Sequence, residues 1–397
     1  MTILKTLALA AGTAFLSSGT LSDSHCSKKN PDKNSLSVQN ASVITANTLS
    51  KDNKIQVALL LDTSNSMDGL IDQAKSRLWN IVNTLTTLKY NGKAPQVEIA
   101  LYEYGNDGIR DENYIRQVTP LTQDLDLVSE KLFALRTNGG SEYCGAVIRD
   151  ASSNLNWDRN ENSMKLIYIA GNEPFNQGKI DYKEVISKAK NRNIYTNTIF
   201  CGSREEGIQN LWQNGASIGS GKYFNIDSDR KVLYIETPYD IRISECNAKL
   251  NDTYIYYGSH GSEYKLKQIA QDKNAEIQSV SNLVERTVSK SKKNAYKNEH
   301  WDLVDRAEKD AGFIASVKES KLPNELRGKS KDEIKKAVAI KSAEREKIQR
   351  EIEMLSKKRQ TYIDDEMKKR GTDNSDDLGK AMESSILELA KKNGYSL

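Results

Sequence analysis

The chain has 397 residues, which is enough for a full hydrophobic core and more than one typical domain needs. Lys and Arg (58) exceed Asp and Glu (54) by a net charge of +4, and this small excess does not predict nucleic-acid binding. The three histidines are too few for a multi-histidine metal or catalytic centre. Hydrophobic residues (37%) and charged residues (28%) are present at the levels of an ordinary soluble protein.

The N-terminus has the pattern of an export signal. A lysine precedes an apolar run from Thr6 to Leu16, which is too short to span a bilayer. We therefore expect a signal peptide over residues 1–19, a secreted or periplasmic protein, and no transmembrane segment. Cys26 follows Asp-Ser-His rather than the small residues of a lipoprotein signal, so no lipid anchor is expected. Residues 20–53 are rich in Ser, Asn and Lys, which predicts a disordered linker.

A strand that ends in a polar turn opens the next region. Residues 55–61 are a nearly continuous apolar run, as expected for a strand covered on both faces. The turn Asp62-Thr63-Ser64-Asn65-Ser66 follows, and apolar residues then recur at helical spacing from Leu70 to Leu88. Strand, turn and helix in this order are typical of the first unit of a parallel α/β fold.

The alternation of strands and helices continues as far as residue 257. It predicts a doubly wound, mostly parallel sheet with helices on both faces over residues 54–257, with residues 114–118 as an antiparallel edge strand. In such folds the ligand site lies at the carboxyl ends of the strands. The other expected strands are residues 97–102, 166–170, 194–200 and 223–226, and the expected helices are residues 127–135, 182–190, 205–212 and 239–250.

Residues 262–397 have a different character, because charge density is high and strand signals are absent. This pattern predicts a C-terminal α-helical region. Ser330 and Glu333 form a capping box at the start of a long helix. Basic residues interrupt its narrow apolar stripe, so the pattern allows a coiled coil near residues 330–370 without requiring one. The interrupting residues are Lys341, Arg345 and Arg359.

The end of the chain is expected to form one more amphipathic helix. Four apolar side chains would lie on one of its faces, and leaving them in water is unfavourable. We therefore expect this helix to dock on the α/β domain or on the long helix before it. The four residues are Leu378, Met382, Ile386 and Leu389.

The polar turn after the first strand carries candidate metal ligands. Asp62, Ser64 and Ser66 offer one carboxylate and two hydroxyls, which are hard oxygen ligands. This set suits Mg²⁺ first, and Mn²⁺ or Ca²⁺ otherwise, rather than Zn²⁺. With so few protein ligands, coordination positions remain for water and for a carboxylate from a partner. The alternative is that these residues only cap the following helix.

Five segments of the chain, in order and with suitable spacing, resemble the von Willebrand factor type A (vWA) family. The resemblance covers roughly residues 54–257 and implies the vWA/Rossmann-like fold expected above. It also implies a metal-ion-dependent adhesion site, whose Asp-x-Ser-x-Ser motif stands here as Asp62, Ser64 and Ser66. Members of this family bind acidic side chains of protein partners through the metal, without catalysis. The matching segments are residues 57–67 (VALLLDTSNSM), 97–106 (VEIALYEYGN), 118–122 (VTPLT), 139–140 (GG) and 166–174 (LIYIAGNEP).

Two loops depart from the family's pattern. The second metal loop usually offers a Thr before a helix, and here Glu142 is the expected substitute ligand. The alternative for Glu142 is a helix-start carboxylate favoured by the helix dipole. The third loop lacks its usual Asp, so Asn172, Glu173 or neither contributes. A site without that acid is expected to bind its ion weakly.

The cysteines suggest a disulfide in an exported protein. Cys144 and Cys201 are both expected at the upper rim of the sheet, so a disulfide between them is predicted. The alternative is a reactive thiol, although no histidine is close in sequence to activate it. Cys246 lies on an apolar helical stripe and is expected to be a buried apolar residue.

These features together predict a non-enzymatic envelope or secreted binding protein. Its vWA domain would engage a protein partner through a divalent metal, and the sequence offers neither a general base nor a glycine-rich phosphate loop. Two alternatives remain. One is a thiol-dependent or metal-dependent enzyme that uses Cys144 and Cys201, and the other is a helical scaffold with an inert vWA domain.

Overall fold

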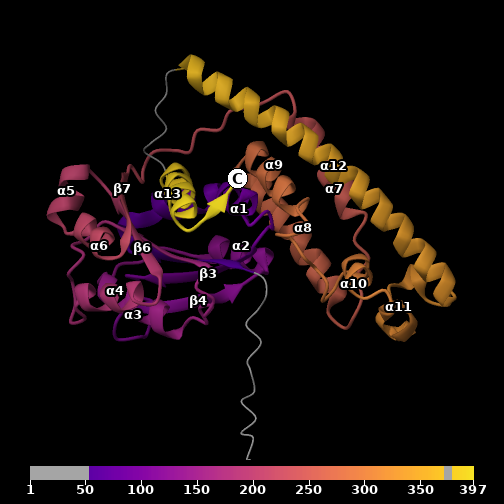
Figure 1. Ribbon diagram of the computed structural model, residues 1–397, viewed down its shortest axis with the longest axis horizontal. Helices are drawn as coiled ribbons and strands as arrows, with labels where there is room; N and C mark the ends of the chain where they lie inside the picture. The colour runs from indigo at the N-terminus through magenta and orange to yellow at the C-terminus, as the bar shows by residue number, and fades with distance from the viewer. Residues whose placement is uncertain (1–52, 371–377) are drawn as a thin grey trace, which may run out of the picture. The chain divides into compact units, whose positions relative to one another are not determined.

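The structure is a computed structural model that describes residues 53–370 and 378–397. A six-stranded sheet in the order β4-β3-β1-β5-β6-β7 contains one antiparallel pair, β3 with β4, and is otherwise parallel (Figure 1). The predicted doubly wound sheet with an antiparallel edge is thereby confirmed. The expected signal peptide and nearly all of the expected linker lie outside the described residues. The strands are β1 (Lys54–Asp62), β3 (Gln96–Tyr104), β4 (Ile115–Thr122), β5 (Met164–Gly171), β6 (Ile194–Cys201) and β7 (Ser220–Ile226).

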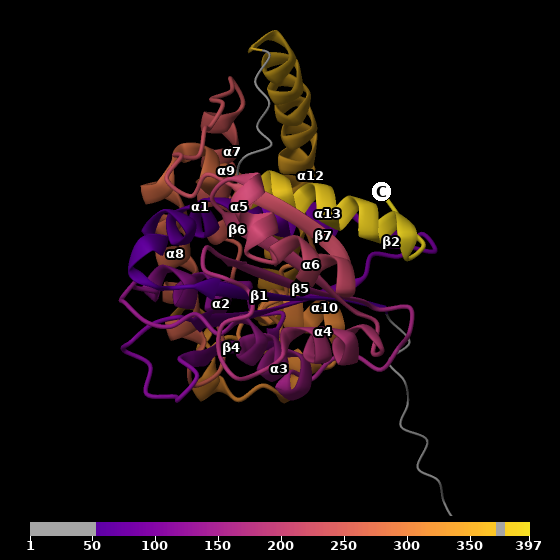
Figure 2. The same cartoon turned by 90° about the vertical axis from the view of Figure 1, so that its left-hand side faces the viewer.

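Helices cover both faces of the sheet, which explains the continuous apolar run in the first strand (Figure 2). Successive side chains of β1 enter opposite cores, with Leu59 and Leu61 on one face and Leu60 on the other. All three are almost completely buried. The first face is covered by α1 (Asp68–Thr87), α2 (Leu125–Ala134) and α13 (Leu378–Lys392), and the second by α3 (Cys144–Asn154), α4 (Tyr182–Lys190) and α6 (Trp212–Ile218).

The prediction of a single helix over residues 205–212 is wrong, because two short helices share this segment of the structure. The first, α5 (Arg204–Gln209), ends before Leu211, whose φ of +70° is a left-handed conformation that interrupts a helix. Trp212 then begins α6 and is completely buried. Its indole Nε1 donates to the carbonyl oxygen of Glu173 at 2.8 Å. The helix is therefore interrupted at Leu211, and the interruption allows the large Trp212 side chain to be buried against the sheet.

The helices after the sheet confirm the predicted C-terminal helical region. The capping box is present: the Ser330 N–H donates to Glu333 Oε2 at 2.8 Å, and the Glu333 N–H donates to Ser330 Oγ at 3.3 Å. Over the described ranges, 53–370 and 378–397, every helix is too short or too polar to cross a membrane. The elements are α7 (Asp240–Asn251), α8 (Gly261–Gln278), α9 (Val280–Lys290), α10 (Leu303–Lys309), α11 (Phe313–Ser316), η2 (Glu319–Lys321), η3 (Asn324–Leu326) and α12 (Lys331–Arg370).

The long helix α12 packs against other helices of the same chain, principally α7 and α10. Two of the arginines that interrupt its apolar stripe make buried contacts. Arg345 Nη1 binds Asp302 Oδ2 at 2.7 Å, and Arg359 Nε binds Asp240 Oδ1 at 2.9 Å. These positions therefore hold α12 against its neighbours by ion pairs, where a coiled-coil seam would place apolar residues.

The last helix, α13, docks on the sheet and confirms the expected burial of its apolar face. Leu378, Met382, Ile386 and Leu389 are each at most 2% exposed and belong to the same core as α1. Ser385 links this helix to two strands, because its Oγ accepts from the Tyr168 hydroxyl at 3.0 Å and donates to Asn197 Oδ1 at 2.7 Å. After α13, β8 (Tyr395–Ser396) pairs with β2 (Lys89–Tyr90). The helices α7–α12 are thus inserted before the final helix of the sheet's own layer.

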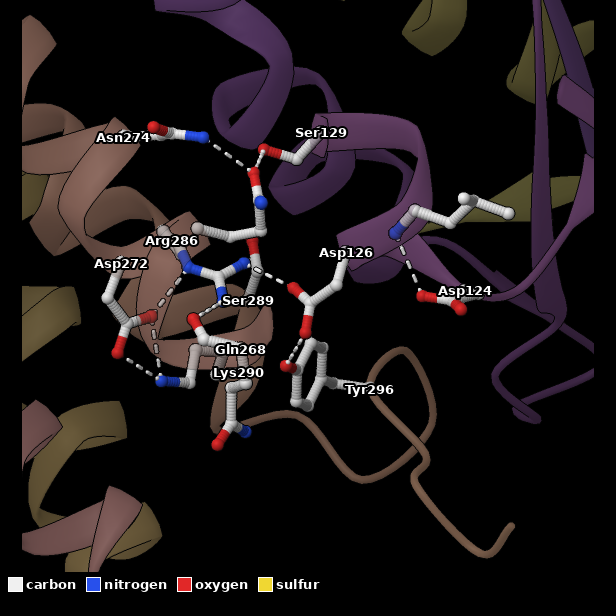
Figure 3. Close-up of polar contacts among 12 residues, drawn as sticks. Asp124, Asp126, Ser129, Gln268, Asp272, Asn274, Arg286, Ser289, Lys290 and Tyr296 are labelled. Atoms are coloured by element: carbon white, nitrogen blue, oxygen red, sulfur yellow. Dashed lines mark hydrogen bonds and ion pairs between the residues drawn. The ribbon is translucent and has the colours of Figure 1, made fainter. Parts of the chain in front are cut away.

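A buried ionic cluster joins the inserted helices to the sheet's helical layer (Figure 3). The Arg286 guanidinium is fully buried and binds Asp272 at 2.6 Å and Asp126 at 2.7 Å. The Lys290 ammonium, also buried, binds Asp272 at 2.9 Å. Arg286 also lies over the Trp79 ring, 4.6 Å from its centroid. Because α1, α2, α8 and α9 all contribute to this cluster, they pack as one unit.

Candidate metal-binding site

The candidate site lies at the carboxyl end of β1. The strands on either side of β1 are β3 and β5. The sheet is extended first on the β3 side and then on the β5 side, so β1 lies at the point where the strand order reverses. Asp62 ends the strand and is completely buried. Its Oδ1 accepts from the Ser64 N–H at 2.8 Å. No group in the described part of the chain donates to Oδ2, which is also buried.

The two serines follow Asp62 on the same turn. Ser64 is almost buried and Ser66 is exposed, and their hydroxyl oxygens are 3.5 Å apart. Neither serine caps a helix: η1 (Asn65–Met67) and α1 both begin without a hydrogen bond from a capping side chain. The helix-capping alternative for this turn therefore lacks its defining contact.

Glu142 reaches the same place from the loop before α3. A methyl group added at Gly105 would lie 2.8 Å from both Asp62 Oδ1 and Glu142 Cγ, so the two acids flank this glycine. Gly105 has a φ of +77°, which other residues rarely adopt. A methyl group at Gly140 would in turn lie 2.4 Å from the Gly105 carbonyl oxygen. Glycine at both positions therefore allows the loop after β3 and the loop before α3 to pack closely enough to bring Glu142 near Asp62.

The third loop, after β5, contributes an amide in place of the usual acid. Asn172 Nδ2 donates to Ser66 Oγ at 3.1 Å. Its Oδ1 is buried, and none of the residues in the described ranges donates to it. Glu173 lies close enough to raise the pKa of both Asp62 and Glu142. Of the two residues that the sequence left open, Asn172 is the one in contact with the serine pair.

Burial raises the pKa of both carboxyls at the site. For Asp62, burial and then the charges of Glu142 and Glu173 outweigh the Ser64 hydrogen bond and raise the pKa to about 8. For Glu142, burial and the charge of Glu173 raise the pKa to about 7. The main cause is the same in each case, because burial penalises the charged form of a carboxyl group, and the neighbouring negative charges add to this penalty. A bound cation would relieve this repulsion.

The donor set fits a divalent cation with oxygen ligands. Asp62 Oδ2 and Asn172 Oδ1 are buried, and no described residue donates to either of them. The turn after Asp62 adds the Ser64 and Ser66 hydroxyls, of which Ser66 Oγ accepts from Asn172 Nδ2. Across residues 53–370 and 378–397, no three His, Cys, Asp or Glu side chains are grouped so as to hold a metal. The site would thus depend on hydroxyl and amide oxygens, which suit Mg²⁺ better than Zn²⁺.

The predicted disulfide between Cys144 and Cys201 is absent, and the structure contains both as buried free thiols. Both lie near Asp62, whose charge acts on each of them, so their expected position at the rim of the sheet is correct. However, Cys144 belongs to the core on the α3 face, and Cys201 belongs to the core on the α1 face. The sheet separates the two sulfur atoms. Cys246 is fully buried in the core, as expected.

The environment of the two thiols does not activate them. Burial, and then the charge of Asp62, raise the pKa of Cys144 and of Cys201 well above the ordinary value. A nucleophilic cysteine needs the opposite shift, because the thiolate is the reactive form. The burial of both sulfur atoms therefore does not favour the reactive-thiol alternative for this pair.

Three residues of the site escaped the sequence analysis. Tyr104 is fully buried and donates from its hydroxyl to the Ala170 carbonyl oxygen at 3.0 Å, which ties β3 to β5 beneath the site. Gly105 and Gly171 allow close approach, since a methyl group at Gly171 would lie 2.9 Å from Asp62 Oδ2. The available signal was a glycine directly after β3 and another as the last residue of β5.

Comparison with known protein families agrees with this fold. Residues 56–236, which are less than half of the chain, match the family model of the von Willebrand factor type A domain. No curated protein sequence matches the chain.

Solved structures with similar folds share little sequence with this chain. Protein BatB from Bacteroides thetaiotaomicron is 17% identical over 44% of this chain and 90% of its own, with a TM-score of 0.34. A proximal thread matrix protein from the mussel byssus, solved with a zinc-occupied MIDAS motif, is 13% identical over 45% of this chain and 43% of its own (TM-score 0.34). The pilus adhesin SpaC from Lactobacillus rhamnosus GG is 15% identical over 45% of this chain and 28% of its own (TM-score 0.34).

Proposed function

We propose that the chain is a non-enzymatic binding protein whose vWA domain engages a protein partner through a divalent cation, Mg²⁺ in the first place. Asp62, Ser64 and Ser66 would hold the ion, with Glu142 and Asn172 completing the protein's share of the ligands. One observation carries the proposal: Asp62 Oδ2 is fully buried, no described residue donates to it, and the turn that follows Asp62 offers two hydroxyls. A buried carboxylate is stable in its charged form only beside a positive charge.

The partner would complete the site with an acidic side chain. Protein oxygens from a few residues leave coordination positions open on a cation that prefers six or more ligands. Ser66 is exposed, so the ion would be reachable from solvent. The N-terminal pattern over residues 1–19 supports export, and we place the protein in the periplasm or outside the cell.

Calorimetric titration of the chelator-stripped protein with Mg²⁺ and Mn²⁺ tests the metal site. Asp62→Asn keeps the size and one acceptor oxygen of the side chain but removes its charge, so we expect it to abolish binding. Asp72→Asn is the matched control, because Asp72 lies on the adjoining helix α1 with its side chain 74% exposed. If Asp62→Asn binds either ion as the parent protein does, the site is assigned to the wrong residues.

Capture of partners from the protein's own source tests the second half of the proposal. A partner that uses the metal should be retained in Mg²⁺, released by chelator and lost with Asp62→Asn, while Asp72→Asn retains it. If the partner is still retained in chelator and by Asp62→Asn, the result would instead support the helical-scaffold alternative.

A further inference from the structure

Three adjoining hollows run along the inserted helices, away from the metal site. The largest, about 810 Å³, lies between α12 and the ends of α1 and α9. It shares Lys293 and Gln349 with a second hollow of about 260 Å³. The second shares Tyr296 and Lys297 with a third, of about 510 Å³, beside the start of α2. We call this run of three hollows the lysine groove, because the segment after α9 that passes along all three carries Lys292, Lys293 and Lys297.

The acids of the lysine groove are already paired with cations. Glu346 binds Lys293 at 3.3 Å, and Glu353 binds Lys357 at 2.7 Å. Glu308 likewise binds Lys293, Glu299 binds Lys309, Asp305 binds Arg345 and Glu98 binds Lys54. The exception is Asp124, which accepts from the Leu127 N–H at 2.9 Å as the cap of α2.

Three lysines of the groove have no such compensation. Lys89 and Lys297 are exposed, and within the described ranges neither forms an ion pair. Lys292 is half-buried, and its ammonium donates to the Asn83 carbonyl oxygen at 3.3 Å and to Thr86 Oγ1 at 2.8 Å, both of which are uncharged acceptors. Burial lowers the pKa of Lys292 to about 8, and no carboxylate opposes this shift. The uncompensated charge of the groove is therefore positive.

The form of the groove limits what can occupy it. It consists of three adjoining hollows that share lining residues along one segment of the chain, so an extended chain fits it better than a compact ion. Its aromatic residues, Tyr254 and Tyr296, are 3% and 7% exposed and offer no face on which bases could stack. Its two arginines already bind acids, Arg345 with Asp302 at 2.7 Å and Arg350 with Glu346 at 3.8 Å. The cations without an ion pair are separate lysines, whereas phosphate recognition favours converging arginines.

We propose that the lysine groove is a second docking site, which takes an extended acidic peptide segment of a partner through Lys89, Lys292 and Lys297. This site lies apart from Asp62 and needs no metal. Carboxylates of the partner form ion pairs with these three lysines. The groove adjoins the mixed charges of α12. It therefore favours a segment in which acidic and uncharged residues alternate, and it disfavours a continuous run of carboxylates.

Fluorescence polarisation with a labelled alternating Glu-Gly peptide tests the proposal on the full chain at low ionic strength and in the presence of chelator. We expect the double variant Lys89→Gln/Lys297→Gln to weaken binding about fivefold or more, since each exposed pair contributes up to about 1 kcal/mol. Added salt should weaken binding to the parent protein as well. The matched control is Lys188→Gln/Lys190→Gln on α4, on the other face of the sheet, which should bind as the parent does.

Lys292→Gln tests the half-buried lysine and should weaken binding further. Because it also removes contacts at the end of α1, its melting temperature is measured alongside; the exposed double variant tests the groove even if this variant is unstable. Asp62→Asn should bind the peptide normally, which separates this site from the metal site. The proposal is overturned if an alternating Gln-Gly peptide binds equally well, if the double variant binds as the control does, or if short single-stranded DNA or pyrophosphate binds more tightly than the acidic peptide.

Discussion

Two buried aspartates of this protein have opposite surroundings. Asp62, at the end of β1, is fully buried, and its nearest charges are the carboxylates of Glu142 and Glu173. Asp272, on α8, is 8% exposed, and its nearest charges are Arg286 and Lys290. Both are aspartates in the protein interior, so their burial alone does not distinguish them.

The difference shows how a buried charge acquires a structural or a functional role. Burial raises the pKa of Asp62 to about 8, and the neighbouring acids add to the shift. Burial acts in the same direction on Asp272, but Lys290 and Arg286 outweigh it and lower the pKa well below its ordinary value. A carboxylate whose positive partners are supplied by the chain stabilises the fold. One that the chain surrounds with further acids is prepared for a cation from outside.

The largest effect is expected when the paired cluster is broken. Asp272→Asn leaves two cations buried in the interior with one carboxylate, Asp126, still bound to Arg286. Uncompensated buried charge of this kind costs about 3–5 kcal/mol. Urea unfolding should show this loss, while the exposed control Asp72→Asn changes stability by less than about 0.5 kcal/mol. A loss no greater than that of the control would mean that the cluster does not hold α8 and α9 to the sheet.

The corresponding change at the other aspartate should have the opposite sign. In chelator, Asp62→Asn removes an unpaired buried charge and is expected to stabilise the protein by about 1–3 kcal/mol near pH 8. Saturating Mg²⁺ should reverse the order, because only the parent protein binds the ion and gains roughly 2.7 kcal/mol at a hundredfold excess over Kd. Thermal unfolding of both proteins in each condition measures this. If Asp62→Asn is destabilised in chelator, the carboxylate has a partner that the geometry does not reveal.

The two aspartates should also respond differently to pH in the metal-free protein. The folded pKa of Asp62 exceeds its unfolded value of about 4, so its contribution to stability is full below that pH and is lost as the pH rises through about 8. The folded pKa of Asp272 is depressed, so its contribution is present above pH 4 and is lost in stronger acid. The stability difference between Asp62→Asn and the parent should therefore grow from pH 5 to pH 8. The loss of stability in Asp272→Asn should instead shrink over this range, because removing Asp272 lowers the already depressed pKa of Lys290 further and lets its ammonium lose the proton. Identical pH profiles for the two variants would contradict the contrast.

The smallest effect on folding is expected from the exposed ligand of the site. Ser66→Ala removes one hydroxyl that accepts from Asn172, and an exposed substitution of this kind changes stability by at most about 0.5 kcal/mol. Mg²⁺ affinity should nevertheless fall several-fold, because one of the oxygens proposed to bind the ion is lost. Calorimetry and urea unfolding on the same preparation separate the two readouts. An unchanged affinity would remove Ser66 from the ligand set.

The sequence by itself determined the sheet, the helices that cover it and the place of the site. The apolar run of β1 and the polar turn from Asp62 to Ser66 are local patterns, and local patterns report the periodicity and burial of one element. The capping box at Ser330 and the apolar face of α13 could be read in the same way. The Asp-x-Ser-x-Ser motif identified the proposed metal ligands in the same way, because all three lie on one turn.

Only the tertiary structure decided which distant side chains meet. The sequence placed Cys144 and Cys201 at one rim, but the faces on which they lie depend on how β6 and α3 pack, and the sheet keeps them apart. The basic residues of α12 interrupt an apolar stripe in the sequence, yet Arg345 finds its buried carboxylates on α10 and just before it. Pairings of this kind join residues far apart along the chain. Their energy depends on the burial and geometry of both partners, and the local sequence around either residue determines neither of these.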